Sequence, residues 1–252
     1  MATEYFLAFD GYGYFKDGVQ PELSRHALIS SDYVYTPEGT SIDIPFFTED
    51  DIEILYTVNG TPTTVDLAAD FDNTAASAVK YVTFAPNTNN SSYTINVYNN
   101  GQTTLLKSIN LIPVCEPKFT PIKCQFINRY GVIQTMYFFK KSTEAMEITD
   151  ARFQKNIISS SASYDTKESQ VQRYDVKGMT RLVLNTGFVN EDFNQTIEEL
   201  LLSEDTWITY EGNVLAAIPT TKQLQYATSV NNKTINYTVQ FDFASETINS
   251  VR

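Results

Sequence analysis

The sequence predicts a mainly β protein, and three observations support this fold class. Tyr and Phe occur 16 times each in 252 residues, a composition that favours strands over helices. Short runs of alternating apolar and polar residues follow one another between residues 41 and 113. Two Asn-Gly pairs, Asn59-Gly60 and Asn100-Gly101, separate such runs and indicate hairpins, because both residue types tolerate positive φ.

The length of the chain favours two domains, since 252 residues exceed the usual size of one. We expect residues 1–26 to form an N-terminal arm or edge strand, with a strand from Tyr5 to Phe9. The alternating runs and regularly spaced turns of residues 27–113 predict an immunoglobulin-like β-sandwich, or a fibronectin-like one.

A prolyl joint, residues 114–121, is expected to connect this sandwich to a second module. Three prolines between Pro113 and Pro121 fix φ and remove backbone donors. The stretch is therefore expected to be semi-rigid and to stay outside any sheet interior.

Residues 122–252 predict an α+β module with an antiparallel sheet. The run Val132–Phe139 follows the turn Asn128–Gly131 and is apolar on both faces, so we place it near the middle of the sheet. Residues 149–160 and 167–177 are polar strand candidates joined by an exposed Ser-rich loop. Residues 235–243 alternate strictly and predict the last strand.

One amphipathic helix is predicted at about residues 190–203. Asn190 is a suitable N-cap, and Glu191 and Asp192 occupy the first turn, where the helix dipole favours acids. One apolar stripe follows at helical spacing, formed by Phe193, Ile197, Leu200 and Leu201 and widened by Leu202.

The charge is strongly acidic and unevenly distributed. The net charge is −12, of which −10 falls on residues 1–112. We expect no direct binding to nucleic acid, because the acidic half repels phosphate. The acidic surface could pair with a basic neighbour, or could simply keep exposed loops solvated. No N-terminal signal pattern and no apolar run of about 20 residues is visible, so we expect no membrane span and folding in a cytoplasm.

Catalytic chemistry is sparse in this sequence. His26 is the only histidine, and no phosphate-loop, metalloprotease or serine-hydrolase motif occurs. We therefore expect a protein that is not an enzyme, with no catalytic residues, no cofactor and no metal. The acidic run at residues 48–51 could chelate Ca²⁺, but a solvated strand entrance is the better interpretation. The other carboxylates are interpreted as polar-face and terminal helix residues, and they are Glu198, Glu199, Glu204 and Asp205.

The remaining candidates are two thiols and a set of loop aromatics. Cys115 and Cys124 are too few for a disulfide framework and are expected to be buried thiols beside the joint. Aromatic residues in polar loops can stack on sugars or anchor a protein contact, or can pack under their own loops. They are Tyr12, Tyr14, Phe15, Tyr33, Tyr35 and Tyr164.

Two long stretches of the second module resemble a known group. The first is IPVCEPKFTPIKCQFINRYGVIQTMYFFKK, residues 112–141. The second extends from Leu182 to Arg252 and includes Asn185-Thr186-Gly187 before the acidic, Leu-rich helix. Together they are similar to virion structural proteins of tailed phages of Bacteroidetes hosts, especially the tail and neck ring proteins of crAss-like podoviruses. The resemblance covers about half of the chain.

This resemblance implies a non-enzymatic subunit of a cyclic ring in the neck or tail barrel below the portal. Its partners would be copies of itself and neighbouring ring, portal, tail or fibre proteins, and it would be located in the virion. The alternative is a fibre, baseplate or head-decoration protein that contacts host surface glycan. A polysaccharide-cleaving enzyme is the third hypothesis.

Overall fold

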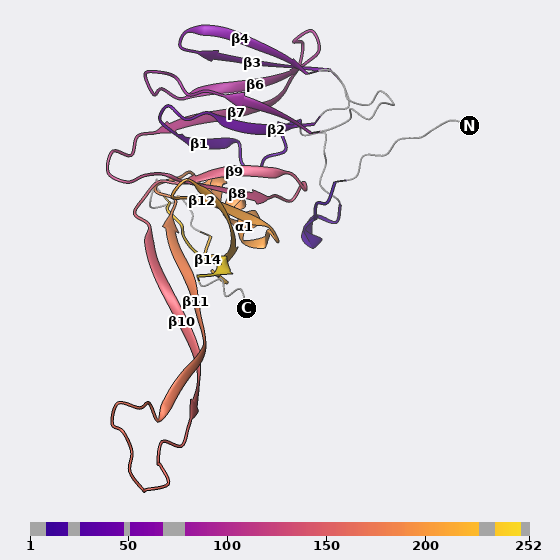
Figure 1. Cartoon of the computed structure of the whole chain (residues 1–252). Helices are drawn as coiled ribbons and strands as arrows, with labels where there is room; N and C mark the ends of the chain where they lie inside the picture. Colours follow the sequence, from indigo (N-terminus) through magenta and orange to yellow (C-terminus); the bar gives the residue numbers. More distant parts are fainter. Residues whose placement is uncertain (1–8, 20–25, 48–50, 68–78, 227–234, 248–252) are drawn as a thin grey trace, which may run out of the picture.

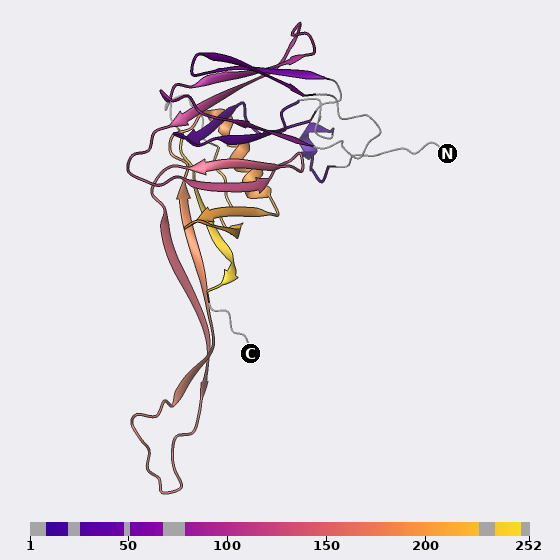
Figure 2. The same ribbon diagram turned by 45° about the horizontal axis from the view of Figure 1, so that its top comes forward.

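The structure is a computed structural model, which describes residues 9–19, 26–47, 51–67, 79–226 and 235–247. It confirms a mainly β fold, with several sheets and one short α-helix among the described residues. In Figure 1 the first module lies at the top and the second module below it, while two strands of the second module project far from the body. Figure 2 shows the same projection from another direction.

The first module contains a five-stranded sheet with the order β1-β7-β6-β3-β4, facing a two-stranded sheet of β2 and β5. Strand β1 runs parallel to β7, and the other pairs are antiparallel. Apolar side chains from both sheets fill the space between them, including Ile44, Phe84 and Ile95. The strands are β1 Tyr33–Pro37, β2 Ile42–Phe46, β3 Ile52–Val58, β4 Thr61–Leu67, β5 Lys80–Phe84, β6 Tyr93–Asn99 and β7 Leu105–Val114.

Both Asn-Gly hairpins are confirmed. Val58 pairs with Thr61, so Asn59 and Gly60 form a two-residue turn with φ values of 52° and 76°. These positive angles are the ones that Asn and Gly adopt at lowest cost. Gly101 also has a positive φ, of 80°, in the longer loop that joins β6 to β7.

The connection between the modules is shorter than predicted at its first end. Strand β7 continues to Val114, and Pro113 lies opposite Thr36 of β1. The expectation that the stretch from Pro113 stays outside a sheet was therefore wrong at Pro113. Proline is tolerated there because the pairing of β7 with β6 ends at Leu111, so β7 is paired on one side only at Pro113.

The second module contains a seven-stranded sheet with the order β10-β11-β14-β13-β12-β8-β9, in which neighbouring strands are antiparallel. The strict alternation predicted for the last strand is confirmed, since Tyr237, Val239, Phe241 and Phe243 are all buried. The strands are β8 Ile122–Ile127, β9 Ile133–Phe138, β10 Thr143–Gln154, β11 Val171–Asn185, β12 Thr206–Tyr210, β13 Asn213–Pro219 and β14 Thr238–Glu246.

The predicted helix consists of a 3₁₀ turn, η3 Glu191–Phe193, followed by α1 Asn194–Leu202. The side chain of Asn190 accepts a hydrogen bond from the backbone N–H of Glu191, as expected of an N-cap. The apolar stripe packs against the sheet, but Leu202 is exposed and does not widen it.

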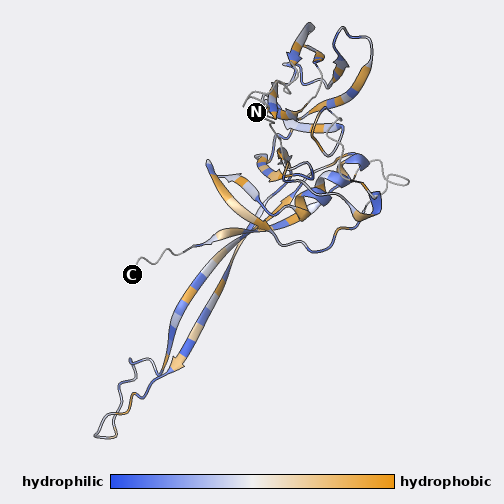
Figure 3. Ribbon diagram, turned by 90° about the vertical axis from the view of Figure 1, so that its right-hand side faces the viewer, coloured by the Kyte–Doolittle hydropathy of each residue, from blue (hydrophilic) through white to orange (hydrophobic). Residues whose placement is uncertain are grey.

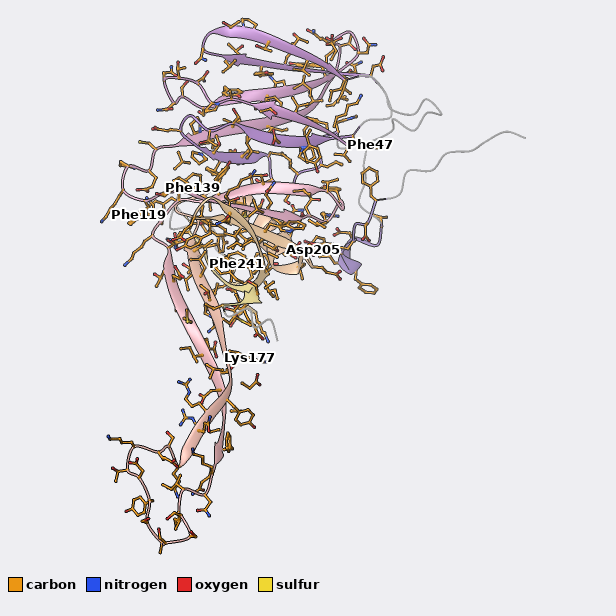
Figure 4. The ribbon with its side chains drawn as sticks, in the orientation of Figure 1. Phe47, Phe119, Phe139, Lys177, Asp205 and Phe241 are labelled. Carbon is orange, nitrogen blue, oxygen red and sulfur yellow. The ribbon has the colours of Figure 1, made fainter. Side chains whose placement is uncertain are left out.

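Strand β9 was wrongly predicted near the middle of the sheet, because it forms one edge. Both faces are nevertheless buried. Met136 and Phe138 belong to the core of the second module, whereas Tyr137 and Phe139 belong to the core of the first. Figure 4 shows Phe139 at the boundary between the two modules. The apolar run therefore reflects two cores that share one strand.

The described part of the N-terminal region, residues 9–19, packs on the turn that precedes β9. The backbone N–H of Tyr12 donates to the carbonyl of Arg129 at 2.9 Å. A Cβ on Gly131 would lie 2.6 Å from the carbonyl carbon of Asp10, so glycine is required for this approach. Most of the strand predicted from Tyr5 lies outside the described residues, and the 3₁₀ turn η1 Phe15–Asp17 follows Tyr14.

Candidate functional site

The predicted chemical candidates do not come together into a metal site. Within the described residues, no group of three or more His, Cys, Asp or Glu side chains could hold a metal ion. His26 precedes the first module, and its carbonyl accepts a hydrogen bond from Phe47. Of the acidic run at 48–51, only Asp51 is described. None of the described helices has the length and apolar character needed to cross a bilayer.

Glu199 is the acidic residue whose position the sequence prediction got wrong. It was expected on the polar face of the helix, but it is fully buried between the two modules. One carboxylate oxygen lies 2.6 Å from the Ser30 hydroxyl and 3.2 Å from the backbone nitrogen of Arg129. The other oxygen accepts a hydrogen bond from Gln195 at 2.9 Å. Helical spacing cannot reveal this, because Ser30 lies 169 residues away.

The surroundings favour the neutral form of this carboxyl. Burial raises the pKa of Glu199 above its ordinary value, and the hydrogen bonds from Ser30, Arg129 and Gln195 oppose the rise without cancelling it. Ser30 has a single hydroxyl proton, yet its oxygen also lies 2.8 Å from the side-chain oxygen of Gln134. A protonated Glu199 can donate to Ser30 and leave the hydroxyl proton for Gln134.

Asn128 and Gln134 belong to the same buried polar cluster as Ser30 and Glu199, which we call the polar seam. The amide of Asn128 donates to the carbonyl of Leu28 at 2.8 Å and to Gln134 at 3.0 Å. Its side-chain oxygen accepts from the backbone of Tyr130 at 3.0 Å, which closes the turn. The Asn-Arg-Tyr-Gly turn at residues 128–131 therefore joins the two modules through hydrogen bonds. These bonds are fixed because a buried amide needs all of its partners.

A surface pocket of about 380 Å³ lies beside the seam, between the N-terminal segment and the end of α1. Its lining carries carboxylates from Asp10, Glu204 and Asp205, but no His, Cys, Lys or Arg. Ser203 lines it as well, and its hydroxyl donates to the carbonyl of Asp205 at 2.7 Å. The hydroxyl proton of Ser203 is therefore directed to a backbone carbonyl and not to one of the carboxylates.

The predicted loop aromatics divide into packed and exposed groups. The hydroxyl of Tyr35 accepts a hydrogen bond from the backbone of Asn190 at 2.9 Å, and its ring meets that of Phe193 edge-on. Tyr12, Tyr14 and Tyr33 are half-buried. Burial raises the pKa of Tyr12 to about 12. Phe15 and Tyr164 remain exposed, so only these two present whole rings to a partner.

The two cysteines differ from the prediction that both are buried. Cys124 is buried in the core of the second module, and this burial raises its pKa. Cys115 is exposed, and a hydrogen bond with Glu38 raises its pKa. Neither is an activated thiolate.

The largest candidate surface is the projecting ribbon of β10, β11 and their connecting loop. We call residues 146–179 the hairpin arm. Beyond the Met179–Glu246 pair, β14 ends and β11 pairs with β10 alone. The predicted polar strands and Ser-rich loop lie here, and the loop is exposed as expected. Figure 3 shows hydrophilic and hydrophobic stretches alternating along both strands.

The hairpin arm carries many exposed apolar side chains, which the sequence prediction missed by treating its strands as polar. The rings of Phe153 and Tyr174 meet edge-on on one face of the ribbon, with their centroids 5.7 Å apart. Nine large apolar side chains of the arm are between 39% and 63% exposed. They are Met146, Ile148, Phe153, Ile158, Tyr164, Val171, Tyr174, Val176 and Met179.

The charges of the hairpin arm balance, although the chain as a whole is acidic. The arm holds five acidic and five basic residues, whereas the whole chain has a net charge of −12. Asp150 accepts hydrogen bonds from Arg152 at 2.8 Å and from Arg173 at 3.1 Å. These contacts hold the pKa of Asp150 below its ordinary value, with the Arg152 bond as the largest cause.

Comparisons of the chain with protein-family models, with curated proteins and with solved structures found no match. The function is therefore inferred from the geometry described above.

Proposed function

We propose that this protein is a structural subunit of a tailed-phage virion, a component of a ring in the neck or tail barrel below the portal. It acts through contacts with copies of itself and with neighbouring ring, portal, tail or fibre proteins, and it catalyses no reaction. The observation that carries this proposal is the hairpin arm. The resemblance of the second module to phage ring proteins supplies the virion context.

The hairpin arm is an element whose stability depends on a partner. A two-stranded ribbon alone is marginally stable in water, and three or more strands or a packed face are normally needed. The arm has neither, and its exposed apolar side chains include Phe153 and Tyr174. Exposed apolar surface of this extent typically marks a binding surface.

The body behind the arm is suited to a fixed assembly. Tyr137 and Phe139 place side chains of the second module in the core of the first, and the polar seam joins the modules by hydrogen bonds. Lys140 and Glu116 add an ion pair of 2.6 Å between the second module and the prolyl joint. A fused body holds the arm at one angle, which ring closure by rotation requires.

We also propose that the first module is an immunoglobulin-like sandwich. Strands β2 and β5 pair on one side, and β3, β6 and β7 are neighbours on the other, as in two-sheet sandwiches of this class. The parallel pairing of β1 with β7 closes one edge of the larger sheet. This scaffold presents loops at both ends and needs no catalytic residue.

The proposal is tested on purified particles and on the isolated full-length chain. We expect the protein in virions by mass spectrometry, at a copy number that matches a ring. Light scattering after size-exclusion chromatography should show a concentration-dependent oligomer. A variant in which residues 150–176 are replaced by Asn-Gly keeps the folded body and should remain monomeric. A strictly monomeric wild-type protein that is absent from purified virions would refute the proposal.

A second candidate function is contact with host surface glycan, as part of a fibre, baseplate or head decoration. It is favoured by Phe15, which is 103% exposed at the tip of a turn, and by Tyr164 at the tip of the arm. Exposed rings can stack on sugars. Binding on a glycan array that is lost in Phe15→Ala or Tyr164→Ala would support this function, and an array with no signal for the wild type would eliminate it.

A further inference from the structure

The two long edges of the hairpin arm carry unpaired backbone groups, and their orientation follows from two hydrogen bonds. The N–H of Lys155 donates to Gln170 across the ribbon at 2.9 Å, so the backbone of Lys155 faces inward. The carbonyl of Gly178 accepts from Thr247 at 2.7 Å, so Gly178 and its partner Ile148 face away from the ribbon. In an antiparallel pair these orientations alternate along each strand.

The two hydrogen bonds predict the same outward-facing residues on β10. Alternation from Ile148 and from Lys155 agrees that the backbone groups of Ile148, Asp150, Arg152 and Gln154 point to the free edge. Alternation from Gln170 turns Val171 and Arg173 outward on the free edge of distal β11. An edge of this kind is a template for another strand.

We propose that the hairpin arms of neighbouring copies pair edge to edge, with the free edge of β10 in one copy hydrogen-bonded to the free edge of distal β11 in the next. This inference rests on the proposed function and specifies its self-contact. Strands β10 and β11 run in opposite directions, so copies related by rotation about an axis along the arm meet as antiparallel strands.

Charge is the reason for choosing a second copy as the partner. Two chains with a net charge of −12 repel each other, so a close contact between copies needs a region where the charges balance. The arm is such a region, and Asp150 lies between Arg152 and Arg173 on one face. Neighbouring arms therefore bring acidic and basic side chains together in alternation.

The pairing is head-to-tail, because the two edges that meet are different. Such contacts generate closed rings when the rotation closes. In a closed ring, both free edges of every hairpin arm would be paired with neighbouring arms.

Cross-linking with one engineered cysteine per chain tests the direction of the pairing. Two full-length variants are made in a Cys115→Ser background, one with Gln154→Cys on β10 and one with Val171→Cys on β11, because both positions face outward and share one face of the ribbon. Cys124 is buried and stays unreactive. In a head-to-tail arrangement, two copies of position 154 are separated by two strands, or about 10 Å, whereas positions 154 and 171 of neighbours lie on adjoining strands and on the same face.

We expect a short bis-maleimide to link the two variants to each other when they are mixed, and to give several-fold less product with either variant alone. A dominant product from the Gln154→Cys variant alone would show a symmetric β10–β10 contact and would overturn the proposal. Absence of any product from an oligomeric sample would overturn it as well, while leaving the proposed ring function intact.

A proline substitution tests the edge independently. Gln154→Pro removes an outward N–H and leaves the ladder between β10 and β11 in place, since edge positions tolerate proline. We expect association at least about tenfold weaker than in the wild type, because edge hydrogen bonds are lost and the proline ring obstructs the neighbour. The matched control Gln154→Thr keeps the N–H and should associate like the wild type. Equal association of both variants would contradict edge pairing.

Discussion

The substitution Phe139→Ala tests whether the two modules unfold as one cooperative unit. Phe139 follows strand β9 of the second module, yet its side chain is 2% exposed within the core of the first. Replacing a buried phenylalanine with alanine typically costs about 3–5 kcal/mol through lost transfer free energy and the cavity that remains. For a chain of this size, each kcal/mol lowers the melting temperature by roughly 2–4 °C.

The single tryptophan makes the test specific to the second module. Trp207 lies in β12 and pairs with Gln125 and Ala216, far in sequence from the core that loses Phe139. If the modules are fused, urea unfolding of Phe139→Ala followed by Trp207 fluorescence and by far-UV circular dichroism should shift to the same lower midpoint. The control Phe15→Ala removes the same side chain from an exposed site and should change the unfolding free energy by less than about 0.5 kcal/mol.

Two transitions would refute the fused-core reasoning. In that case the circular dichroism of Phe139→Ala would show an early phase from the first module, while the Trp207 midpoint would stay at the wild-type value.

Three other substitutions test the seam and the turn that joins the modules. Because burial raises the folded-state pKa of Glu199, the wild type should lose unfolding free energy as pH rises from about 4.5 through that raised value. Glu199→Gln should lack this loss, and equal pH profiles of the two proteins in urea titrations would contradict the assignment. Gly131→Ala should cost more than Gly60→Ala, since both have positive φ but only the former meets backbone within 3 Å; equal costs would argue against docking of the N-terminal segment. Tyr35→Phe removes the hydroxyl that accepts from the exposed backbone N–H of Asn190 and should cost about 0.5–1.5 kcal/mol in the same assay, whereas no change would show that water replaces the hydroxyl.

Several elements were predictable because their signals are local. The Asn59-Gly60 turn needs only two residues that accept positive φ, and the structure shows both angles. The helix and the last strand have clear periodicity, and Asn190 caps the helix through its own side chain. In these cases a few neighbouring residues determine the backbone.

The errors occur where the deciding contact is distant in sequence. The two apolar faces of β9 indicated a central strand, but Tyr137 and Phe139 are buried by the first module instead of a second layer of the same sheet. Glu199 occupies a position that would be polar in an isolated helix, and Ser30 and Arg129 bury it. Helical or strand periodicity cannot distinguish these surroundings.

The hairpin arm shows a different limit of sequence analysis. Its two strands and polar loop were predicted, but the predicted strand ends differ by four to eight residues from those of β10 and β11, and neither the length of the paired ribbon nor its projection from the body was predicted. Register and the end of β14 determine where the third strand is lost, and neither is visible in the alternation of β10 or β11.

Hydrogen exchange of the arm amides, compared between dilute monomer and assembled protein, shows whether copies of the chain meet through the hairpin arm. The account predicts fast exchange at Ile148, Arg152 and Gln154 in the monomer, where their N–H groups face solvent, and strong protection of the same amides after assembly. Protection confined to the first module, with these three amides exchanging as fast as before, would show that copies meet elsewhere and would contradict the role assigned to the arm.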